Sequence, residues 1–419
     1  MSATPSRFQS PFLRNFVARG QYYDCTDAEA LDALFGKERV TAYIGFDCTA
    51  ASLHVGSLVQ LMTLRRLQQA GHRPILLMGG GTTKIGDPSG KDETRRLLTA
   101  EQIEENKNSI LSGVRHLLRF GDGPSDAIMV DNAEWLDRLE YISFLRDYGR
   151  HFSVNRMMTM ESVKLRLERE QPLSFLEFNY SIMQAYDFVE LYRRYGCRLQ
   201  SSGSDQWGNV VSGIDLGRRV ENVQLFGLTT PLITTASGAK MGKTAAGAVW
   251  LNADMCSPYQ YWQFWRNTED GDVGRFLRIF TDMADDEITR LEALQGGELN
   301  EAKKILATEA TAVLHGRAAA DAAAGTARRT FEEGAIGEGL PTVEIARGEF
   351  PLGVLTLAVR AGVAASNSEA RKLIANNGLR INDHPVSDPK SEVSASDVTA
   401  DGVVKLSAGK KKHVLVRPV

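Results

Sequence analysis

Apolar positions between residues 40 and 81 change their spacing in a way that predicts two strands and a helix. Residues 40–46 form a β-branched and aromatic run, which is typical of a buried strand. Residues 53–67 carry apolar side chains at helical spacing, and Ser52 is placed to cap this helix. A second short strand is expected at 74–78, before the three glycines at 79–81. Strand, helix, strand and loop within about forty residues indicate a βαβ unit and a parallel sheet.

The second half of the chain has a different pattern. Residues 257–333 are rich in alanine, leucine and charged side chains at helical spacing, which predicts a helical region. Residues 334–348 are rich in glycine and are expected to form a linker. Beyond them, Ser366 and Glu369 form a capping box for a short helix that ends at Asn377, and two short strands are expected after it.

The composition is that of a soluble globular protein with more than one domain. The 419 residues exceed what one ordinary core accommodates, and 43% of them are hydrophobic and 24% charged. No apolar run approaches the ~20 residues that span a bilayer, and the first twenty residues lack the continuous apolar core of a secretory signal. We therefore expect a cytoplasmic protein that does not bind membranes. The four cysteines form no CxxC pair, so neither disulfides nor a zinc site is predicted.

Charge is distributed unevenly along the chain. The formal net charge is -3, but residues 351–419 contain ten Lys/Arg and six Asp/Glu, a net of +4 that leaves -7 on the remainder. A basic C-terminal segment on an acidic body is typical of an RNA-binding protein, although a solvated surface gives the same count.

The first loop with candidate chemistry covers residues 45–57. His54 and the start of the predicted helix offer donors and positive potential to a phosphate, and Gly56 allows close approach of a ligand. Taken by itself, a lone histidine is more often a satisfied surface or core residue than a phosphate ligand. The loop follows a predicted strand, and ligands of open α/β sheets bind at the carboxyl ends of strands.

A second loop, residues 82–91, combines an acid with cations. Asp87 and Lys91, with Arg95 one turn further on, suit an ammonium group beside a polyphosphate. Glycine-rich loops of this kind are otherwise simple turns. Because this loop also follows a predicted strand, we expect it at the same edge of the sheet as the first.

The third loop carries Lys240, Lys243 and Thr244, which can fold over a leaving pyrophosphate. The same segment nearly matches the phosphate-binding pattern GxxxxGK[ST]. That pattern requires glycine at position 237, where the chain has Ser237, and Gly238 comes one residue late. The spacing therefore excludes a P-loop.

Taken together, these loops resemble the signatures of class I aminoacyl-tRNA synthetases. Residues 54–57 and 240–244 are similar to the sequences usually written HIGH and KMSKS. Four more motifs look like those of bacterial-type tyrosyl-tRNA synthetases, in order: YIGFD at 43–47, IGDPSGK at 85–91, YSIMQAYD at 180–187 and GSDQWGN at 203–209. The resemblance extends from about Phe12 to the end of the chain.

The chain departs from the family pattern at four positions. Ser57 replaces the second histidine of HIGH, which removes one imidazole donor, so the phosphate role falls mainly on His54. Gly242 and Thr244 replace the two serines of KMSKS, as is common in this family. Cys48 stands where proline is frequent, which should alter only the stiffness of the loop.

The resemblance implies an α/β fold with a Rossmann-like, parallel-sheet catalytic domain, followed by an α-helical domain and a small α+β RNA-binding domain. We expect the catalytic domain at 1–250, the helical anticodon-side domain at 251–335, a linker at 336–350 and the RNA-binding domain at 351–419. The family is homodimeric, and residues 144–158, apolar and aromatic between charges, are a candidate interface.

It also implies tyrosine–tRNA ligase activity in two steps. The carboxylate of L-tyrosine attacks the α-phosphate of ATP and releases pyrophosphate, and a terminal ribose hydroxyl of tRNA(Tyr) then accepts the tyrosyl group. Because the first nucleophile is already an anion, catalysis requires positioning and charge stabilisation rather than a general base. Mg²⁺ is expected to arrive with ATP, bound through phosphates and water, without a metal site on the protein.

The matched motifs assign site residues in three groups. The phosphates and the departing pyrophosphate would be held by Thr49, His54, Lys91, Arg95, Lys240, Lys243 and Thr244. The rest of ATP would meet Gly45, Asp47, Gly56, Ser57, Gly203 and Asp205. Tyrosine would be bound at its phenol by Tyr43 and Asp187, at its ammonium by Asp87, Tyr180 and Gln184, and elsewhere by Gln200 and Gln206. RNA phosphates would contact Arg371, Lys372, Arg380, Lys410, Lys411 and Lys412.

Three other functions fit parts of the sequence. A tryptophan-specific class I synthetase shares the fold, but the pairing of Tyr43 with Asp187 and the basic C-terminal segment favour tyrosine. A non-catalytic RNA-binding relative would not need the phosphate-loop residues that this chain retains. A generic nucleotide hydrolase is disfavoured by the failed P-loop spacing. Amino-acid-dependent exchange between ATP and pyrophosphate separates these possibilities.

Overall fold

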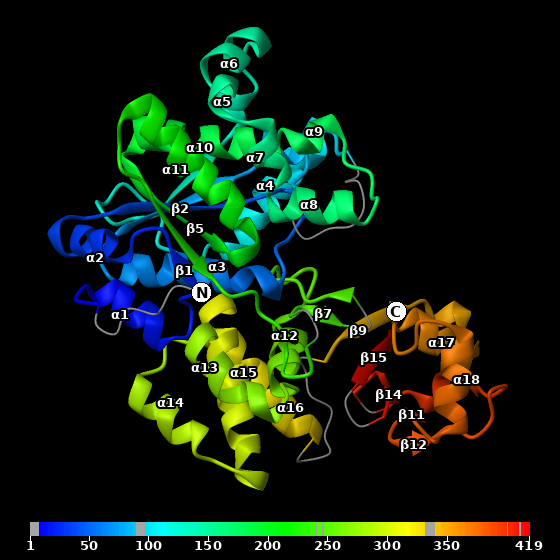
Figure 1. Cartoon of the computed structure of the whole chain (residues 1–419). Helices are drawn as coiled ribbons and strands as arrows, with labels where there is room; N and C mark the ends of the chain where they lie inside the picture. Colours follow the sequence, from blue (N-terminus) through cyan, green and yellow to red (C-terminus); the bar gives the residue numbers. More distant parts are fainter. Residues whose placement is uncertain are drawn as a thin grey trace. The chain divides into compact units, whose positions relative to one another are not determined.

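The computed structural model describes residues 8–88, 97–238, 241–244, 247–331, 340–399, 401–409 and 412–419, with the side chains of 243, 244 and 331 left out. The chain divides into two compact units. The first comprises residues 1–256 and 264–316, and the second comprises residues 257–263 and 317–419. Each is described by itself below, and Figure 1 labels their elements.

The first unit is built on a six-stranded sheet with the order β1-β6-β5-β2-β3-β4. Its strands are β1 (Asp24–Cys25), β2 (Thr41–Phe46), β3 (Arg73–Met78), β4 (Ile128–Asp131), β5 (Cys197–Gly203) and β6 (Phe226–Thr230). All neighbouring strands are parallel except β1 and β6. The predicted βαβ unit is confirmed, because β2 and β3 pair in parallel and helix α3 (Val55–Gln69) connects them.

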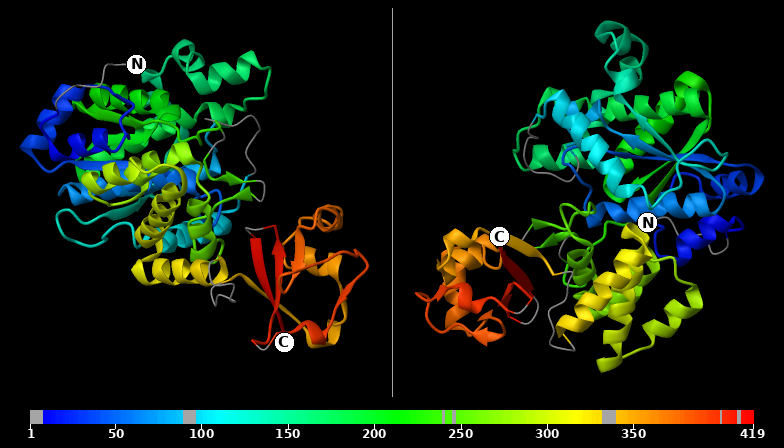
Figure 2. Two further views of the ribbon diagram at one scale, coloured as in Figure 1. Left: turned by 90° about the horizontal axis from the view of Figure 1, so that it is seen from below. Right: turned by 180° about the vertical axis from the view of Figure 1, so that it is seen from behind.

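Helices cover both faces of this sheet. Helix α3 and α1 (Pro11–Ala18) pack on one face, and α10 (Tyr180–Tyr195) and α11 (Trp207–Glu221) pack on the other. Helices α13 (Val273–Phe280), α14 (Asp285–Glu292) and α15 (Leu299–His315) lie on the α3 side, as the rear view of Figure 2 shows. The remaining helices of this unit are α2 (Ala28–Lys37), α4 (Ala100–Val114), α5 (Ala133–Leu136), α6 (Tyr141–Asp147), α7 (Val154–Met158), α8 (Glu161–Glu168) and α9 (Phe175–Phe178).

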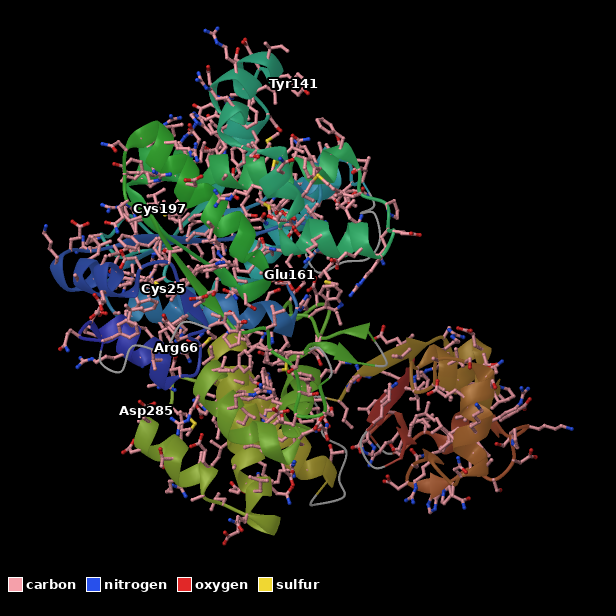
Figure 3. The ribbon with its side chains drawn as sticks, viewed as in Figure 1. Cys25, Arg66, Tyr141, Glu161, Cys197 and Asp285 are labelled. Carbon is pink, nitrogen blue, oxygen red and sulfur yellow. The ribbon has the colours of Figure 1, made fainter. Side chains whose placement is uncertain are left out.

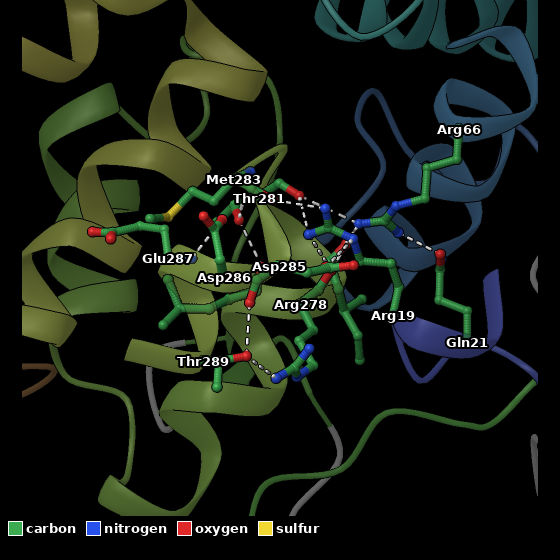
Figure 4. A network of polar contacts seen from close by, with 12 residues as sticks. Arg19, Gln21, Arg66, Arg278, Thr281, Met283, Asp285, Asp286, Glu287 and Thr289 are labelled. Atoms are coloured by element: carbon green, nitrogen blue, oxygen red, sulfur yellow. Dashed lines mark hydrogen bonds and ion pairs between the residues drawn. The ribbon is translucent and has the colours of Figure 1, made fainter. Parts of the chain in front are cut away.

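Two buried arginines join α13 to the sheet layer (Figure 4). Arg66 of α3, only 4% exposed, donates to the carbonyls of Arg278 at 2.8 Å and Ile279 at 2.7 Å. Arg19, which follows α1, donates to the carbonyl of Arg278 in α13 at 3.4 Å and to that of Met283, beyond the end of α13, at 2.6 Å. Carbonyls at the end of a helix lack intrahelical partners and carry partial negative charge, so guanidinium groups satisfy them well. Burial lowers the pKa of Arg66 to about 9.

Helix α3 begins differently from the prediction. Its N-cap is His54, whose Nδ1 accepts a hydrogen bond from the backbone N–H of Gly56 at 3.0 Å. The expected cap, Ser52, instead uses its Oγ to accept from the backbone N–H groups of Leu251 at 3.1 Å and Asn252 at 3.0 Å. The Ser52 prediction was wrong because a segment two hundred residues away takes up the hydroxyl.

The second unit contains a five-stranded sheet with the order β12-β11-β14-β15-β9. Its strands are β9 (Thr342–Ile345), β11 (Leu379–Ile381), β12 (His384–Pro385), β14 (Val404–Ala408) and β15 (Lys412–Pro418), with a separate pair of β10 (Leu352–Gly353) and β13 (Glu392–Val393). Helices α16 (Arg317–Phe331), α17 (Val354–Arg360) and α18 (Asn367–Ala375) belong to this unit, and α12 (Pro258–Arg266) begins in it. Ser366 caps α18 as predicted, by accepting from the N–H of Glu369.

Two expectations for this unit were wrong. The expected linker contains strand β9, which pairs in parallel with β15. More than two strands follow α18, because β11, β12, β13, β14 and β15 all lie beyond it. Several of these strands are only two or three residues long, so local alternation of apolar residues is a weak signal for them. None of the helices in the described residues is both long and apolar enough to cross a bilayer.

Candidate active site

The direction of strand order reverses between β2 and β5, which lie side by side in the middle of the sheet. From β2 the chain runs outward to β3 and β4, and it then returns to place β5 on the other side of β2. Ligands of open α/β sheets bind outside the carboxyl ends of the strands at such a point. Gly45 near the end of β2 is exposed, and a Cβ at this position would make only an ordinary contact with Leu77, at 3.8 Å.

One end of the candidate site is a buried carboxylate, Asp187 of α10, which is 2% exposed. The indole N–H of Trp135 donates to its Oδ1 at 2.7 Å, and the Asn132 amide donates to its Oδ2 at 2.9 Å. Burial raises the pKa of Asp187 to about 7, and the two donors oppose this rise by stabilising the anion. The result is a fixed carboxylate whose charge is poorly compensated.

Tyr43 of β2 lies close enough to this carboxylate for its hydroxyl to be affected by the charge of Asp187. Its side chain is 1% exposed, and its hydroxyl has no hydrogen-bond partner within the described part of the chain. The Oε1 of Gln200, which sits opposite Tyr43 on β5, is likewise buried without a partner among the described residues. Burial, followed by the charge of Asp187, raises the pKa of Tyr43 well above its usual value. Buried polar atoms left unpaired are costly, so these two favour a ligand that pairs with them.

A second acidic group lies around Tyr180, at the start of α10. The Tyr180 hydroxyl is 3.3 Å from both carboxylate oxygens of Asp47, and the Thr82 hydroxyl donates to Oδ1 of Asp47 at 2.9 Å. Burial and then the charges of Asp47, Asp87 and Asp187 raise the pKa of Tyr180 well above its usual value. Several carboxylates close to one buried hydroxyl create a negative potential, which suits an ammonium group.

The second loop joins this acidic group through Asp87. Its Oδ2 accepts a hydrogen bond from Nε2 of Gln206 at 2.8 Å, which links the loop after β3 to the loop after β5. Asn209 in turn donates to Oε1 of Gln206 at 2.9 Å and fixes the orientation of that amide. Gln184 is half-buried on α10, one turn after Tyr180 and one turn before Asp187.

The two signature-like segments, two hundred residues apart in the chain, meet at Gly56. A Cβ on Gly56 would lie 2.7 Å from Cε1 of His54 and 3.2 Å from the carbonyl oxygen of Met241, and a Cβ on Gly242 would lie 3.0 Å from the N atom of Gly56. His54 also forms an isolated β-bridge with Trp250. Because Nδ1 of His54 accepts a hydrogen bond, the neutral ring carries its proton on Nε2.

Other predicted residues lie around this edge. Thr49 is exposed in the loop after β2, and Ser57 is half-buried in the first turn of α3. Asp205 is exposed after β5, and a Cβ on Gly203 would fall 2.6 Å from its Oδ1. Lys91, Arg95 and Lys240 lie outside the described residues, and Lys243 and Thr244 are described only in their backbone, as strand β7 (Lys243–Thr244), which pairs with β8 (Gly247–Ala248).

Sequence reasoning missed Asn132, Trp135 and Thr82, which hold the carboxylates in place. The Asn132 amide bonds Asp187 and Thr82, and its Oδ1 accepts from the backbone N–H of Gly81 at 2.8 Å. All three residues lie just beyond the ends of β3 and β4. That position was the available signal, since polar residues after parallel strands share one edge of the sheet.

The predicted RNA-binding residues belong to the second unit. Arg371 and Lys372 are exposed on α18, Arg380 is exposed on β11 and Lys412 is exposed at the start of β15. Lys410 and Lys411 lie outside the described residues. Exposed cations on one small unit can contact phosphates without any cost of burial.

Comparisons with known proteins agree along the whole chain. The family model described as tRNA synthetases class I (W and Y) matches residues 36–332, and the model of the tyrosine–tRNA ligase SYY-like C-terminal domain matches residues 326–416. The tyrosine–tRNA ligase of Bradyrhizobium diazoefficiens is 63% identical over 413 residues, which cover 98% of this chain and 99% of that protein. The chain belongs to the tyrosine–tRNA ligase family. The ligase of Rhizobium meliloti is 62% identical over 416 residues, 99% of this chain and 100% of that protein.

Solved structures share the fold. A C-terminally truncated mitochondrial tyrosyl-tRNA synthetase of Aspergillus nidulans matches with a TM-score of 0.69 and 29% identity, covering 76% of this chain and 94% of that chain. A tryptophanyl-tRNA synthetase of Plasmodium falciparum matches with a TM-score of 0.54 and 15% identity, covering 73% and 84%. The second match shows only a common fold, whereas the full-length relatives are tyrosine–tRNA ligases. These comparisons therefore support tyrosine over the tryptophan alternative.

Proposed function

We propose that the residues beyond the carboxyl ends of β2 and β5 carry out both steps of the tyrosine–tRNA ligase reaction. The chain is a class I aminoacyl-tRNA synthetase that uses ATP to join tyrosine to its tRNA. The observation that carries the proposed site is the pair formed by the unpartnered Tyr43 hydroxyl and the buried Asp187 carboxylate. The phenol of the substrate, entering between them, would donate a hydrogen bond to the Asp187 carboxylate and accept one from the Tyr43 hydroxyl.

This arrangement explains selection of tyrosine over phenylalanine. A phenylalanine side chain would leave the Tyr43 hydroxyl unpaired and Asp187 uncompensated, and buried polar groups without partners are costly. At the other end of the substrate, Asp87, Tyr180 and Gln184 are proposed to bind the ammonium group. After burial, the charges of Asp47, Asp87 and Asp187 raise the pKa of Tyr180, and this negative potential supports the assignment. Gln200 and Gln206 would complete the tyrosine pocket.

The phosphates are proposed to lie where the two signature-like segments meet. The Nε2–H of His54 and the first turn of α3 at Gly56 and Ser57 would face the α-phosphate, and Thr49 would lie in the same loop. The other proposed phosphate ligands are Lys91, Arg95, Lys240, Lys243 and Thr244. Gly45, Asp47, Gly203 and Asp205 would contact the rest of ATP. Each oriented donor contributes about 2.7–4 kcal/mol if it acts like an oxyanion-hole donor.

Mg²⁺ is proposed to enter as part of the substrate MgATP. The carboxylates at the sheet edge are already engaged, since Asp47 accepts from Tyr180 and Thr82, and Asp87 accepts from Gln206. An ion there would take most of its ligands from phosphate and water, as Mg²⁺ commonly does. It would neutralise phosphate charge, while the residues of the chain orient the substrates.

Exchange between ATP and pyrophosphate in the presence of tyrosine, phenylalanine or tryptophan tests the proposal. Exchange should require tyrosine. Asp187→Ala should raise the KM for tyrosine and reduce discrimination against phenylalanine, whereas Lys243→Ala should lower kcat and leave tyrosine binding nearly unchanged. The two variants serve as controls for each other. Equal loss of both properties in both variants would contradict the separate roles assigned to these residues.

We also propose that the enzyme is a homodimer. Apolar side chains are exposed near the expected interface at 144–158, including Tyr141 at 62%, Ile142 at 73%, Val154 at 59% and Met158 at 46%. Figure 3 labels Tyr141 on α6, the helix at the top of the view. Exposed apolar patches of this kind mark interaction sites.

Sedimentation of an Ile142→Glu, Val154→Glu double variant tests the dimer. It should yield monomers, whereas Leu97→Glu, at another exposed apolar position (66% exposed), should not. A double variant that sediments like the wild type would contradict this interface.

The remaining proposals concern RNA and organisation. Arg371, Lys372, Arg380 and the lysines at 410–412 would bind tRNA phosphates, and the cytoplasm, where tRNA(Tyr) is used, is the proposed location. We retain 1–250, 251–335 and 351–419 as functional divisions, and strand β9 within 336–350 joins the last of them through its pairing with β15. The RNA proposal is tested by titrating labelled tRNA with a variant in which Arg371 and Lys372 of the second unit are replaced.

A further inference from the structure

The segment that leads into the Lys240–Thr244 loop is held by a buried acid outside both signatures. Asp272 is 2% exposed, and its Oδ2 accepts a hydrogen bond from the backbone N–H of Ala236 at 2.7 Å. Arg275 pairs with Oδ1 of Asp272 at 2.5 Å and donates to the carbonyl of Thr234. A carboxylate that accepts from a backbone N–H and from a guanidinium fixes both partners more firmly than neutral groups do.

The helix that follows Asp272 is itself anchored near the first signature. Asp272 immediately precedes α13, and the carbonyls at the far end of α13 are bound by Arg66 of α3, as Figure 4 shows. His54 is the N-cap of α3. One short helix therefore connects the approach to the second signature with the helix that starts at the first.

The segment that leaves the loop is fixed by a second buried contact. Ser52 Oγ accepts from the N–H groups of Leu251 and Asn252, and the Asn252 amide donates to the carbonyl of Ser109 at 2.8 Å and to its Oγ at 3.0 Å. Ser52 and Asn252 are 3% and 6% exposed. A Cβ on Gly113 of α4 would fall 1.9 Å from Oδ1 of Asn252, so the amide packs directly on that helix.

We propose that Asp272 and Asn252 are positioning residues for adenylate formation. They hold the two ends of the segment that carries Lys243, so that its backbone stays beside Gly56 and His54. Neither residue is among those proposed to contact tyrosine or ATP. The inference rests on the role proposed for Lys243, because the contacts matter to the chemistry only through the cations that the loop delivers to the phosphates. Misplacement of such groups by about 1 Å can cost about 100-fold in rate.

Double-variant kinetics in the full-length enzyme tests this. Asp272→Ala and Asn252→Ala should each lower kcat of tyrosine-dependent ATP–pyrophosphate exchange by about ten- to hundredfold, with the KM for tyrosine changed less than about twofold. Combined with Lys243→Ala, each should slow exchange by less than about twofold beyond Lys243→Ala alone, because residues that act as a unit are not additive. Asp270→Ala, two residues away and 75% exposed, is the matched control and should leave kcat unchanged.

Arg275→Gln keeps the test valid if Asp272→Ala does not fold. The Arg275 side chain is 40% exposed, and in this variant Asp272 keeps its hydrogen bond from the Ala236 N–H, whereas the contact of residue 275 with Thr234 is lost. It should reproduce the loss of kcat and the lack of additivity with Lys243→Ala. If the effects of these variants add fully to that of Lys243→Ala, or if kcat and tyrosine affinity fall equally, the positioning role is overturned while the role of Lys243 stands. Unchanged exchange in Lys243→Ala would overturn the role of Lys243 and the inference with it.

Discussion

Replacing Asp187 with asparagine should make the free enzyme more stable at alkaline pH while weakening its recognition of tyrosine. Burial raises the pKa of this carboxyl from its usual value of 3.8 to about 7. A raised folded-state pKa favours folding below the unfolded pKa, and this contribution is lost as the pH rises from about 4 through 7. Ionised Asp187 therefore destabilises the free enzyme above pH 7.

The size of the effect follows from two opposing contributions. At pH 8.5 the raised pKa of Asp187 lowers the free energy of unfolding of the wild type by about 4 kcal/mol. At pH 5 it lowers it by only about 2 kcal/mol, because Asp187 is then mostly protonated in the folded state. Asparagine offers one acceptor oxygen in place of two, so either Asn132 or Trp135 loses its acceptor, which costs about 1–3 kcal/mol. The net gain should be about 1–3 kcal/mol at pH 8.5 and about zero at pH 5.

Urea denaturation of the wild type and Asp187→Asn at the two pH values measures this difference. The exposed Asp122→Asn is a control that should show no pH-dependent difference from the wild type. Tyrosine KM should rise in Asp187→Asn, because the phenol loses its anionic acceptor. A variant that is less stable than the wild type at pH 8.5, or a difference that is the same at both pH values, would refute the reasoning.

Three further predictions concern other parts of the chain. Arg66→Met should lower the free energy of unfolding by about 3–5 kcal/mol in urea denaturation, since it leaves buried carbonyls at the end of α13 unpaired. Gly242→Ala should reduce kcat of pyrophosphate exchange, because residue 242 has φ +80° and its Cβ would fall 3.0 Å from the Gly56 N atom; unchanged kcat would be contrary evidence. Arg371→Ala with Lys372→Ala should leave exchange unchanged and reduce the salt dependence of tRNA binding by about two phosphate contacts, which filter binding at several salt concentrations would detect.

The parallel sheet could be predicted because its signal is local. Residues 40–46 and 74–78 are continuous apolar runs, and residues 53–67 have helical spacing, so each element is encoded within its own segment. The expectation that the loops after these strands share one edge needs only the geometry of parallel strands. Contacts such as Gln206 with Asp87 agree with that expectation.

The contacts that the sequence did not reveal join distant segments. Ser52 has the chemistry of a helix cap, but its hydroxyl is taken up by Leu251 and Asn252, which no local pattern indicates. Trp135 and Asn132 lie more than fifty residues before the carboxylate that they hold. The short strands of the second unit depend on pairing partners rather than on their own composition.

The central claim is that the amino-acid site lies beyond the carboxyl ends of β2 and β5. A crystal structure of the enzyme with bound tyrosine would test this claim most directly. The phenol oxygen should lie within hydrogen-bond distance of both the Tyr43 hydroxyl and the Asp187 carboxylate, and the ammonium group should face Asp87 and Tyr180. Tyrosine bound with its phenol elsewhere, and with Tyr43 still unpaired, would contradict the account.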